Sequence, residues 1–154
     1  DENFFLYNED ADFSWRANLL GCSILSVPKS IIYHDYRLQV SPEKVYHLEK
    51  GRYLILRKYL SRGELFLLFP SLVVAESLTF GYAARFGLKG LRYKVSALYD
   101  GFTANVQKTT GDKKALMARL SPSIPEDQLT LNRVEWLGRV FANKVFQWNF
   151  RALR

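Results

Sequence analysis

The sequence predicts a short α/β segment, one helix and two strands, followed by a mainly α-helical region that is hydrophobic and basic. Two observations support this fold class. Two runs rich in β-branched residues follow a helical pattern near the start of the chain. From residue 41 onward the spacing of apolar residues becomes helical. We therefore expect three parts, over residues 1–40, 41–110 and 111–154.

The first helix has recognisable signals at both ends. Asn8 can cap a helix that begins at Glu9, and Gly21 stands where the end of a helix often needs a left-handed residue. Asp12 and Arg16 are four residues apart, so they can form an ion pair across one turn. These signals predict a helix over residues 9–20.

Two short strands are expected after this helix. The runs are Ile24–Val27 and Ile31–His34, and Pro28 begins the break between them. Two strands and one helix cannot close a core, so these runs indicate the edge of a larger α/β layer.

The helical region begins at Ser41-Pro42, with Ser at the cap and Pro in the first turn, and its first helix extends to about Leu60. Residues 65–84 then form an apolar run that contains Glu76 as its one charge and Pro70 near its start. The run is long enough to cross a bilayer, but a mid-membrane carboxylate is unfavourable. A hairpin or interfacial helix broken at Pro70, or a buried helix of a soluble bundle, fits as well.

Two further helices are predicted. Residues 88–106 carry an apolar stripe with Lys89, Arg92 and Lys94 beside it, which is typical either of a core-facing helix or of a helix on an anionic membrane. The members of the stripe are Leu88, Leu91, Val95, Leu98, Phe102 and Val106. A loop with a short helical piece is expected over 109–127. Residues 134–150 combine aromatic and basic side chains, a composition that suits a membrane interface or stacking on nucleic acid.

The charge is distributed unevenly. The formal net charge is +7, with a net −4 in residues 1–35 and a net +11 in residues 36–154. A basic surface of this size suits an anionic bilayer or nucleic acid, although lysine-rich helices of an ordinary soluble protein have the same composition. No nucleic-acid-binding motif is present. The single cysteine, Cys22, excludes an internal disulfide framework.

An ordered pattern covers the first 34 residues. The segment Phe4–Phe13 (FFLYNEDADF) is followed by Arg16, Gly21, Pro28 and His34. This order resembles the end of the catalytic domain of family 2 glycosyltransferases, which have the GT-A fold. The basic helix around residues 49–58 and the apolar residues after it loosely resemble the region that follows that domain. The resemblance is specific over 1–34, loose over 41–100 and absent beyond about 115.

The resemblance implies roles for individual residues. Asp10 matches the base that takes the proton from the acceptor hydroxyl in an inverting transfer. His34 matches a ligand of the divalent metal, Mg²⁺ or Mn²⁺, that holds the departing diphosphate. Glu9 and Asp12 would orient this site, and Arg16 would hold Asp12. Acids in the first turn of a helix often only stabilise it, and a histidine at a strand end often only packs.

Arg52 can bind a diphosphate or a lipid phosphate through its planar guanidinium, although a solvated helix face explains it equally. No Asp-x-Asp metal motif of the nucleotide-binding half and no Gly-rich phosphate loop is found, because Asp10 and Asp12 belong to the later motif. The nucleotide-binding half is therefore expected to be missing, and these 154 residues alone are expected to be inactive.

The function expected from the resemblance is transfer of a sugar from a nucleotide-sugar donor to a lipid-linked or polysaccharide acceptor. The expected location is the cytoplasmic face of the membrane, with either peripheral or integral attachment. The alternative is a non-enzymatic module that binds an anionic membrane surface through basic amphipathic helices. Nucleic acid is not expected as a partner.

Overall fold

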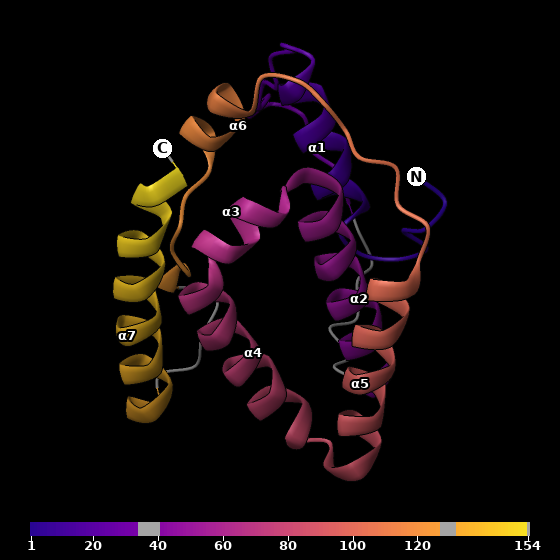
Figure 1. The fold of residues 1–154 in the computed structure, drawn as a ribbon, viewed down its shortest axis with the longest axis vertical. Coiled ribbons are helices and arrows are strands. Elements are labelled where there is room, and N and C mark those ends of the chain that lie inside the picture. The colour runs from indigo at the N-terminus through magenta and orange to yellow at the C-terminus, as the bar shows by residue number, and fades with distance from the viewer. Residues whose placement is uncertain (34–40, 127–131, 154) are drawn as a thin grey trace.

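The computed structural model describes residues 1–33, 41–126 and 132–153, and over these residues the chain is helical (Figure 1). The elements are, in order, α1 (Glu9–Leu19), α2 (Pro42–Tyr59), α3 (Arg62–Leu67), α4 (Phe69–Ala84), α5 (Gly87–Thr103), α6 (Lys113–Arg119), α7 (Arg133–Phe150) and the 3₁₀ turn η2 (Arg151–Leu153). Helices α2 and α5 lie side by side, α4 packs against both α5 and α7, and α1 contacts α6.

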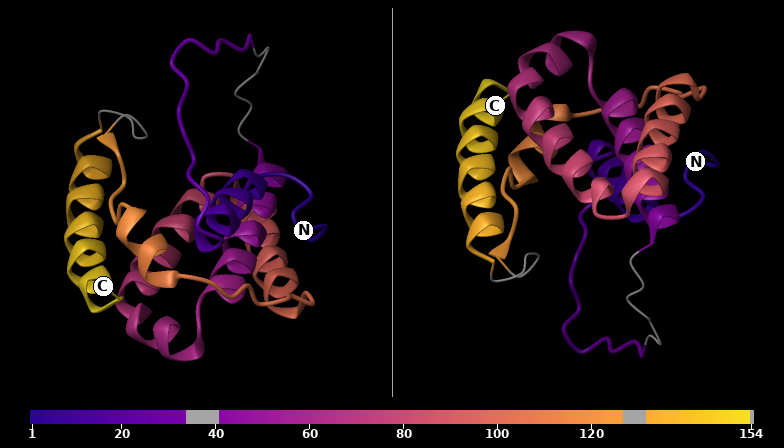
Figure 2. Two further views of the ribbon diagram at one scale, coloured as in Figure 1. Left: turned by 90° about the horizontal axis from the view of Figure 1, so that it is seen from above. Right: turned by 90° about the horizontal axis from the view of Figure 1, so that it is seen from below.

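The predicted α/β segment is wrong, because none of the described residues forms a strand. Ile24–Val27 and the described part of the second run, 31–33, are exposed and extend away from the helices (Figure 2). High β-propensity produces a strand only where a neighbouring strand pairs with its backbone, and no described segment pairs with this one. His34 lies outside the described residues.

The end of α1 and the start of α2 follow the local signals, whereas the side-chain cap expected from Asn8 at the start of α1 does not form. After α1, Gly21 adopts φ 78°, its N–H donates to Asn18 O, and the N–H of Cys22 donates to Ala17 O. This pair of bonds is a Schellman motif, which satisfies carbonyls at the end of the helix. At the start of α2, the Ser41 side chain accepts a hydrogen bond from the N–H of Lys44.

The apolar run 65–84 contains the end of α3 and all of α4. Ser61 and Glu64 form a capping box that starts α3, and Pro70 stands in the first turn of α4, where its missing N–H costs nothing. No helix among the described residues combines the length and apolar character needed to cross a bilayer. Glu76 is ion-paired within the helical body.

Helix α5 buries a different face from the one its apolar stripe indicated. The buried residues are Gly90, Lys94, Ala97 and Gly101, whereas Leu88, Val95 and Phe102 of the predicted stripe are exposed. Small residues bring α5 close to α2: a Cβ on Gly101 would lie 2.7 Å from Cβ of Tyr53. The pattern correctly predicted a helix, but the core-facing reading of its apolar stripe is wrong.

A small apolar core joins α1, α2 and α6. It contains Leu19, Ile55, Tyr59 and Leu116, with Trp15 packed against it. On the other side of the molecule, Asn149 fixes α7 both to the end of α3 and to the first turn of α4. Its side-chain oxygen accepts from Ser71 Oγ at 2.7 Å, and its amide nitrogen donates to Leu67 O. These contacts leave the side of α7 that faces away from α4 uncovered (Figure 1).

Candidate functional site

The start of α1 carries the acidic residues singled out by the sequence. Glu9 and Asp10 are exposed in its first turn. One carboxylate oxygen of Asp10 accepts a hydrogen bond from the N–H of Ala11 at 2.7 Å. No described residue donates to the other oxygen. The Asp10 side chain is therefore held near the backbone of α1 while remaining accessible to solvent.

The backbone before α1 is placed by an unusual turn. Tyr7 and Asn8 both have φ near +64°, a region that non-glycine residues seldom occupy. Asn8 makes no side-chain cap; its amide instead donates to Leu48 O of α2 at 3.1 Å. Gly51 makes room for this contact, since a Cβ there would lie 2.5 Å from Asn8 Nδ2. The turn thus fixes the start of α1 against α2.

Asp12 is the anchor of α1. It is 1% exposed, and its carboxylate forms ion pairs with Lys58 Nζ at 2.8 Å and with Arg16 Nε at 3.2 Å. Tyr59 donates its hydroxyl to Asp12 Oδ1 at 2.6 Å, and Asp1 also pairs with Lys58. The Asp12–Arg16 pair expected from the spacing is present, and the contacts with α2 are additional.

These partners determine the charge state of Asp12. Burial acts to raise the pKa of its carboxyl, but the hydrogen bonds from Lys58 and Tyr59 and the charges of Lys58 and Arg16 outweigh burial, so the pKa lies below its ordinary value. Burial and the bond to Asp12 raise the pKa of Tyr59, which stays protonated as a donor. Asp12 is thus a fixed anion that holds α1 on α2.

Arg52 does not lie in this cluster. Its guanidinium binds Glu49 Oε2 at 2.7 Å and also pairs with Glu76 of α4. Burial acts to lower the pKa of Arg52, but the hydrogen bonds and charges of the two glutamates raise it. A phosphate would have to compete with two carboxylates already in place. The phosphate role of Arg52 stays a prediction.

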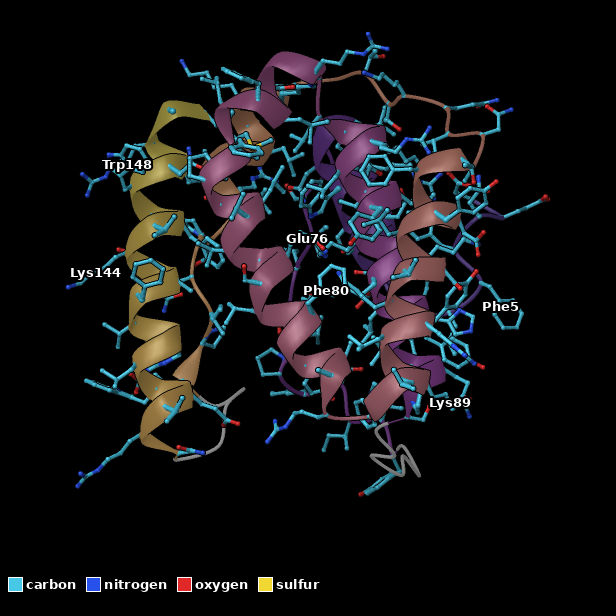
Figure 3. All side chains as sticks on the ribbon, turned by 60° about the horizontal axis from the view of Figure 1, so that its bottom comes forward. Phe5, Glu76, Phe80, Lys89, Lys144 and Trp148 are labelled. Atoms are coloured by element: carbon cyan, nitrogen blue, oxygen red, sulfur yellow. The ribbon has the colours of Figure 1, made fainter. Side chains whose placement is uncertain are left out.

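The partners of Arg52 belong to a wider ionic network that joins α2, α4 and α5. At its centre Lys94, which is 0% exposed, pairs with Glu49 and with Glu76, the latter at 2.9 Å. Lys94 also donates to Tyr53 Oη and Thr79 Oγ1, both at 2.8 Å. Figure 3 shows Glu76 and Phe80 pointing from α4 toward the space between these helices. We call the set Glu49, Arg52, Tyr53, Glu76, Thr79 and Lys94 the ionic network.

The ionic network matches two cations with two carboxylates. Burial acts to raise the pKa of Glu76, but hydrogen bonds from Lys94 and Arg52 hold it below its ordinary value. Burial raises the pKa of Tyr53, so its hydroxyl remains a donor to Glu76 at 2.8 Å. The buried charges are thus compensated, and the arrangement serves to hold three helices in register.

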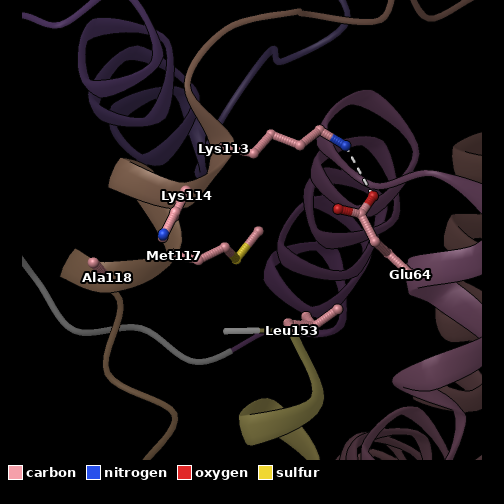
Figure 4. A pocket seen from close by; sticks show the side chains of 6 residues that line it. All are labelled: Glu64, Lys113, Lys114, Met117, Ala118 and Leu153. Atoms are coloured by element: carbon pink, nitrogen blue, oxygen red, sulfur yellow. Dashed lines mark hydrogen bonds and ion pairs between the residues drawn. The ribbon is translucent and has the colours of Figure 1, made fainter.

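A third polar feature is a cavity of about 450 Å³ between α3 and α6 (Figure 4). Lys113 pairs with Glu64 at 2.8 Å across this cavity. Lys114 lines it beside the apolar side chains of Met117 and Leu153.

The described residues offer no ligand set for the divalent metal that the resemblance implies. No group of three or more histidine, cysteine or acidic side chains comes together among them. The oxygens of Asp12 already bind Lys58, Tyr59 and Arg16. We therefore assign no chemical step to a metal at this site.

Sequence reasoning did not identify Lys58, Lys94 or Tyr59 as members of these clusters. A partial signal existed for the ionic network, because Glu76 is the one charge in an apolar run and Glu49 and Arg52 stand three residues apart. No comparable signal marks Lys58, whose partners lie more than forty residues away in the chain.

No protein family model, curated protein or solved structure significantly matches the chain. The function of the chain is therefore inferred from its residues and their geometry, together with the resemblance of the first 34 residues to family 2 glycosyltransferases.

Proposed function

We propose that this chain supplies the acceptor-side base of an inverting glycosyltransferase of family 2, acting at the cytoplasmic face of a membrane. The observation that carries the proposal is the contrast between Asp10 and Asp12. Asp12 is buried and bound by three partners, whereas Asp10, two residues earlier, is exposed. A base needs an accessible carboxylate on a fixed backbone, and this arrangement supports that role.

The proposed step is a single displacement. The acceptor hydroxyl oxygen forms a bond to the anomeric carbon of the donor sugar while the bond from that carbon to the nucleotide diphosphate breaks. The hydroxyl proton passes to the carboxylate of Asp10, and the diphosphate leaves with the bonding electron pair. The anchoring of Asp12 keeps α1, and with it Asp10, in a constant position on α2.

In this proposal the nucleotide-sugar donor is bound by a nucleotide-binding half that the described residues do not contain. The divalent metal, Mg²⁺ or Mn²⁺, is bound by that half together with His34, the ligand that the resemblance implies. The acceptor is a lipid-linked saccharide or a growing polysaccharide. Glu9 lies beside Asp10 in the first turn of α1 and would contribute to orienting the acceptor.

A second candidate is a non-enzymatic module that binds an anionic membrane surface. It is favoured by the exposed aromatic and basic residues of α7. In this case the acids of α1 would only stabilise the start of the helix.

The substitution Asp10→Asn, made in the gene within its source cells, separates the two candidates. Membrane fractions are assayed for transfer of labelled sugar from nucleotide-sugar donors to endogenous acceptor. Loss of a general base predicts a fall of about a hundredfold or more. The matched control is Glu2→Gln, which removes the same charge from another exposed residue. Unchanged transfer in Asp10→Asn would remove Asp10 as the base.

An antibody against the carboxy terminus provides the companion measurement, the mass of the native species. A species much larger than 17.9 kDa would mean that the nucleotide-binding half belongs to the same polypeptide. A species of this mass that co-purifies with transfer activity would mean that a partner chain supplies it. A species of this mass without such a partner would contradict the catalytic proposal and favour the membrane module.

A further inference from the structure

Helix α7 exposes a regular stripe of side chains. Residues three or four apart along a helix lie on the same face, and the stripe follows this spacing over the helix and the turn after it. All its members are exposed. We call these residues the α7 outer face: Val134, Leu137, Phe141, Lys144, Trp148 and Arg151. Figure 3 shows Lys144 and Trp148 pointing away from α4.

The charges of the α7 outer face are all positive. Lys144 and Arg151 form no ion pair with a described residue, and Arg133 at the start of α7 forms none either. The one acid of α7, Glu135, pairs instead with Arg85. An anionic surface would therefore meet cations that no described carboxylate neutralises.

The apolar part of this face continues onto the junction of α3 and α4. Trp148 lines a cavity of about 440 Å³ together with Phe66, Leu67, Phe69 and Pro70. The cavity walls are mainly apolar side chains, and Phe66 and Phe69 are exposed around it. A hollow of this kind beside a tryptophan accommodates the upper part of an acyl chain, while the indole lies at the level of the headgroups.

We propose that the α7 outer face, with the hollow beside Trp148, docks on an anionic lipid bilayer. This inference deepens the proposed function, on which it rests, by naming the surface that meets the membrane. Apolar side chains enter the headgroup boundary, and Lys144 and Arg151 contact lipid phosphates.

Pairing of α7 with a second copy of the chain is less favourable on electrostatic grounds. Two such stripes would bring Lys144 and Arg151 of one copy toward a surface that carries only the same positive charges. Like charges at an interface oppose association, whereas anionic lipids compensate them.

Helix α5 provides the internal comparison. Its exposed side includes Leu88, Val95, Tyr99 and Phe102, with Arg92 as a cation that pairs with no described acid. Its other exposed cation, Lys89, is neutralised by Glu43 at 2.8 Å. Neither of the two cavities described above is lined by a residue of α5. Lipid binding is thus assigned to α7 rather than to α5.

The test is retention of the purified chain on vesicles made of phosphatidylglycerol and phosphatidylcholine in equal parts, compared with phosphatidylcholine alone. We expect retention on the anionic vesicles only, weakening as salt is raised. Two matched pairs locate the surface. Trp148→Ala is compared with Tyr99→Ala, whose side chains are 65% and 67% exposed. Lys144→Glu is compared with Arg92→Glu, both exposed cations.

The α7 variants should weaken the apparent vesicle affinity by about tenfold, and the α5 variants by less than about twofold. All four positions are exposed, so unchanged circular dichroism should confirm that the variants fold. Equal losses within the pairs, or no retention of the wild type, would overturn the proposal. Retention lost only in the α5 variants would also overturn it. The proposal would also be overturned if light scattering showed that the wild type is a dimer, that Trp148→Ala abolishes this dimer, and that Trp148→Ala is still retained on the vesicles.

The vesicle assay is independent of catalysis. Asp10→Asn should leave vesicle retention unchanged. If Asp10→Asn leaves transfer intact while the two matched pairs behave as expected, the docking surface stands and the catalytic proposal fails. If transfer depends on Asp10 but the α7 variants bind vesicles like wild type, the docking surface is wrong and the proposed function remains.

Discussion

Removing the amine of Lys94 tests whether the ionic network holds the helices together. Lys94 is fully buried and contacts Glu49, Glu76, Tyr53 and Thr79. In Lys94→Met the apolar stem is retained, but Glu49 and Glu76 keep only Arg52 as a cationic partner. The substitution therefore removes one buried charge and keeps most of the side-chain packing.

The expected magnitude follows from burial. Breaking a buried ion pair by removing one partner costs about 3–5 kcal/mol. The remaining charge of Arg52 and the partial exposure of Glu76 place this case at the lower end, about 3 kcal/mol. With a urea dependence of about 2 kcal/mol per molar, the unfolding midpoint should fall by about 1.5 M.

The assay is urea unfolding followed by far-ultraviolet circular dichroism. Lys89→Met is the matched control on the same helix, because Lys89 and its partner Glu43 are both exposed, and its midpoint should not change. A double-mutant cycle between Lys94→Met and Glu76→Gln should show non-additive losses. Equal midpoints for wild type and Lys94→Met would refute the view that the network stabilises the fold.

Two further predictions concern the packing of α5 on α2 and the behaviour in acid. Gly101→Ala should destabilise the fold by about 1–3 kcal/mol, because its new methyl group would collide with Tyr53. The control Gly81→Ala should stabilise the fold by up to about 1 kcal/mol, because a Cβ at Gly81 meets nothing within 4 Å. Equal effects of the two variants in thermal unfolding would contradict the close packing of α5 on α2. Hydrogen bonds from Lys113 and Ser61 outweigh burial and lower the pKa of Glu64 from 4.5 to about 2. The ionised Glu64 carboxylate therefore contributes its full stabilisation above about pH 4.5, and this stabilisation is lost as the pH falls toward 2. The unfolding free energy of wild type should therefore decrease more steeply over this range than that of Glu64→Gln, and parallel curves would rule out the contribution.

The sequence predicted features that depend on near neighbours in the chain. Ser41-Pro42 set the start of α2, and Gly21 marked the end of α1, because caps and left-handed turns are local structures. The pairing of Asp12 with Arg16 is local for the same reason.

The features that were missed depend on residues far apart in the chain. The two runs of residues 24–33 have β-propensity, but a strand requires a partner that the described helices do not offer. Lys94 stood beside an apolar stripe and was expected off the buried face, yet contacts with residues 15 to 45 positions away bury it completely. Small residues on α5 determined which face packs, a property that hydrophobicity alone does not indicate.

Because α1 is anchored on α2 by its own side chains, the peptide link between the two helices is not needed to keep them together. Helix α1 is held by Asp12 on Lys58 and Tyr59, and by Leu19 in the core shared with Leu116. None of these contacts uses the exposed segment over residues 24–33. A protease that cuts this segment should therefore yield two peptides that remain associated under native conditions and separate only in denaturant.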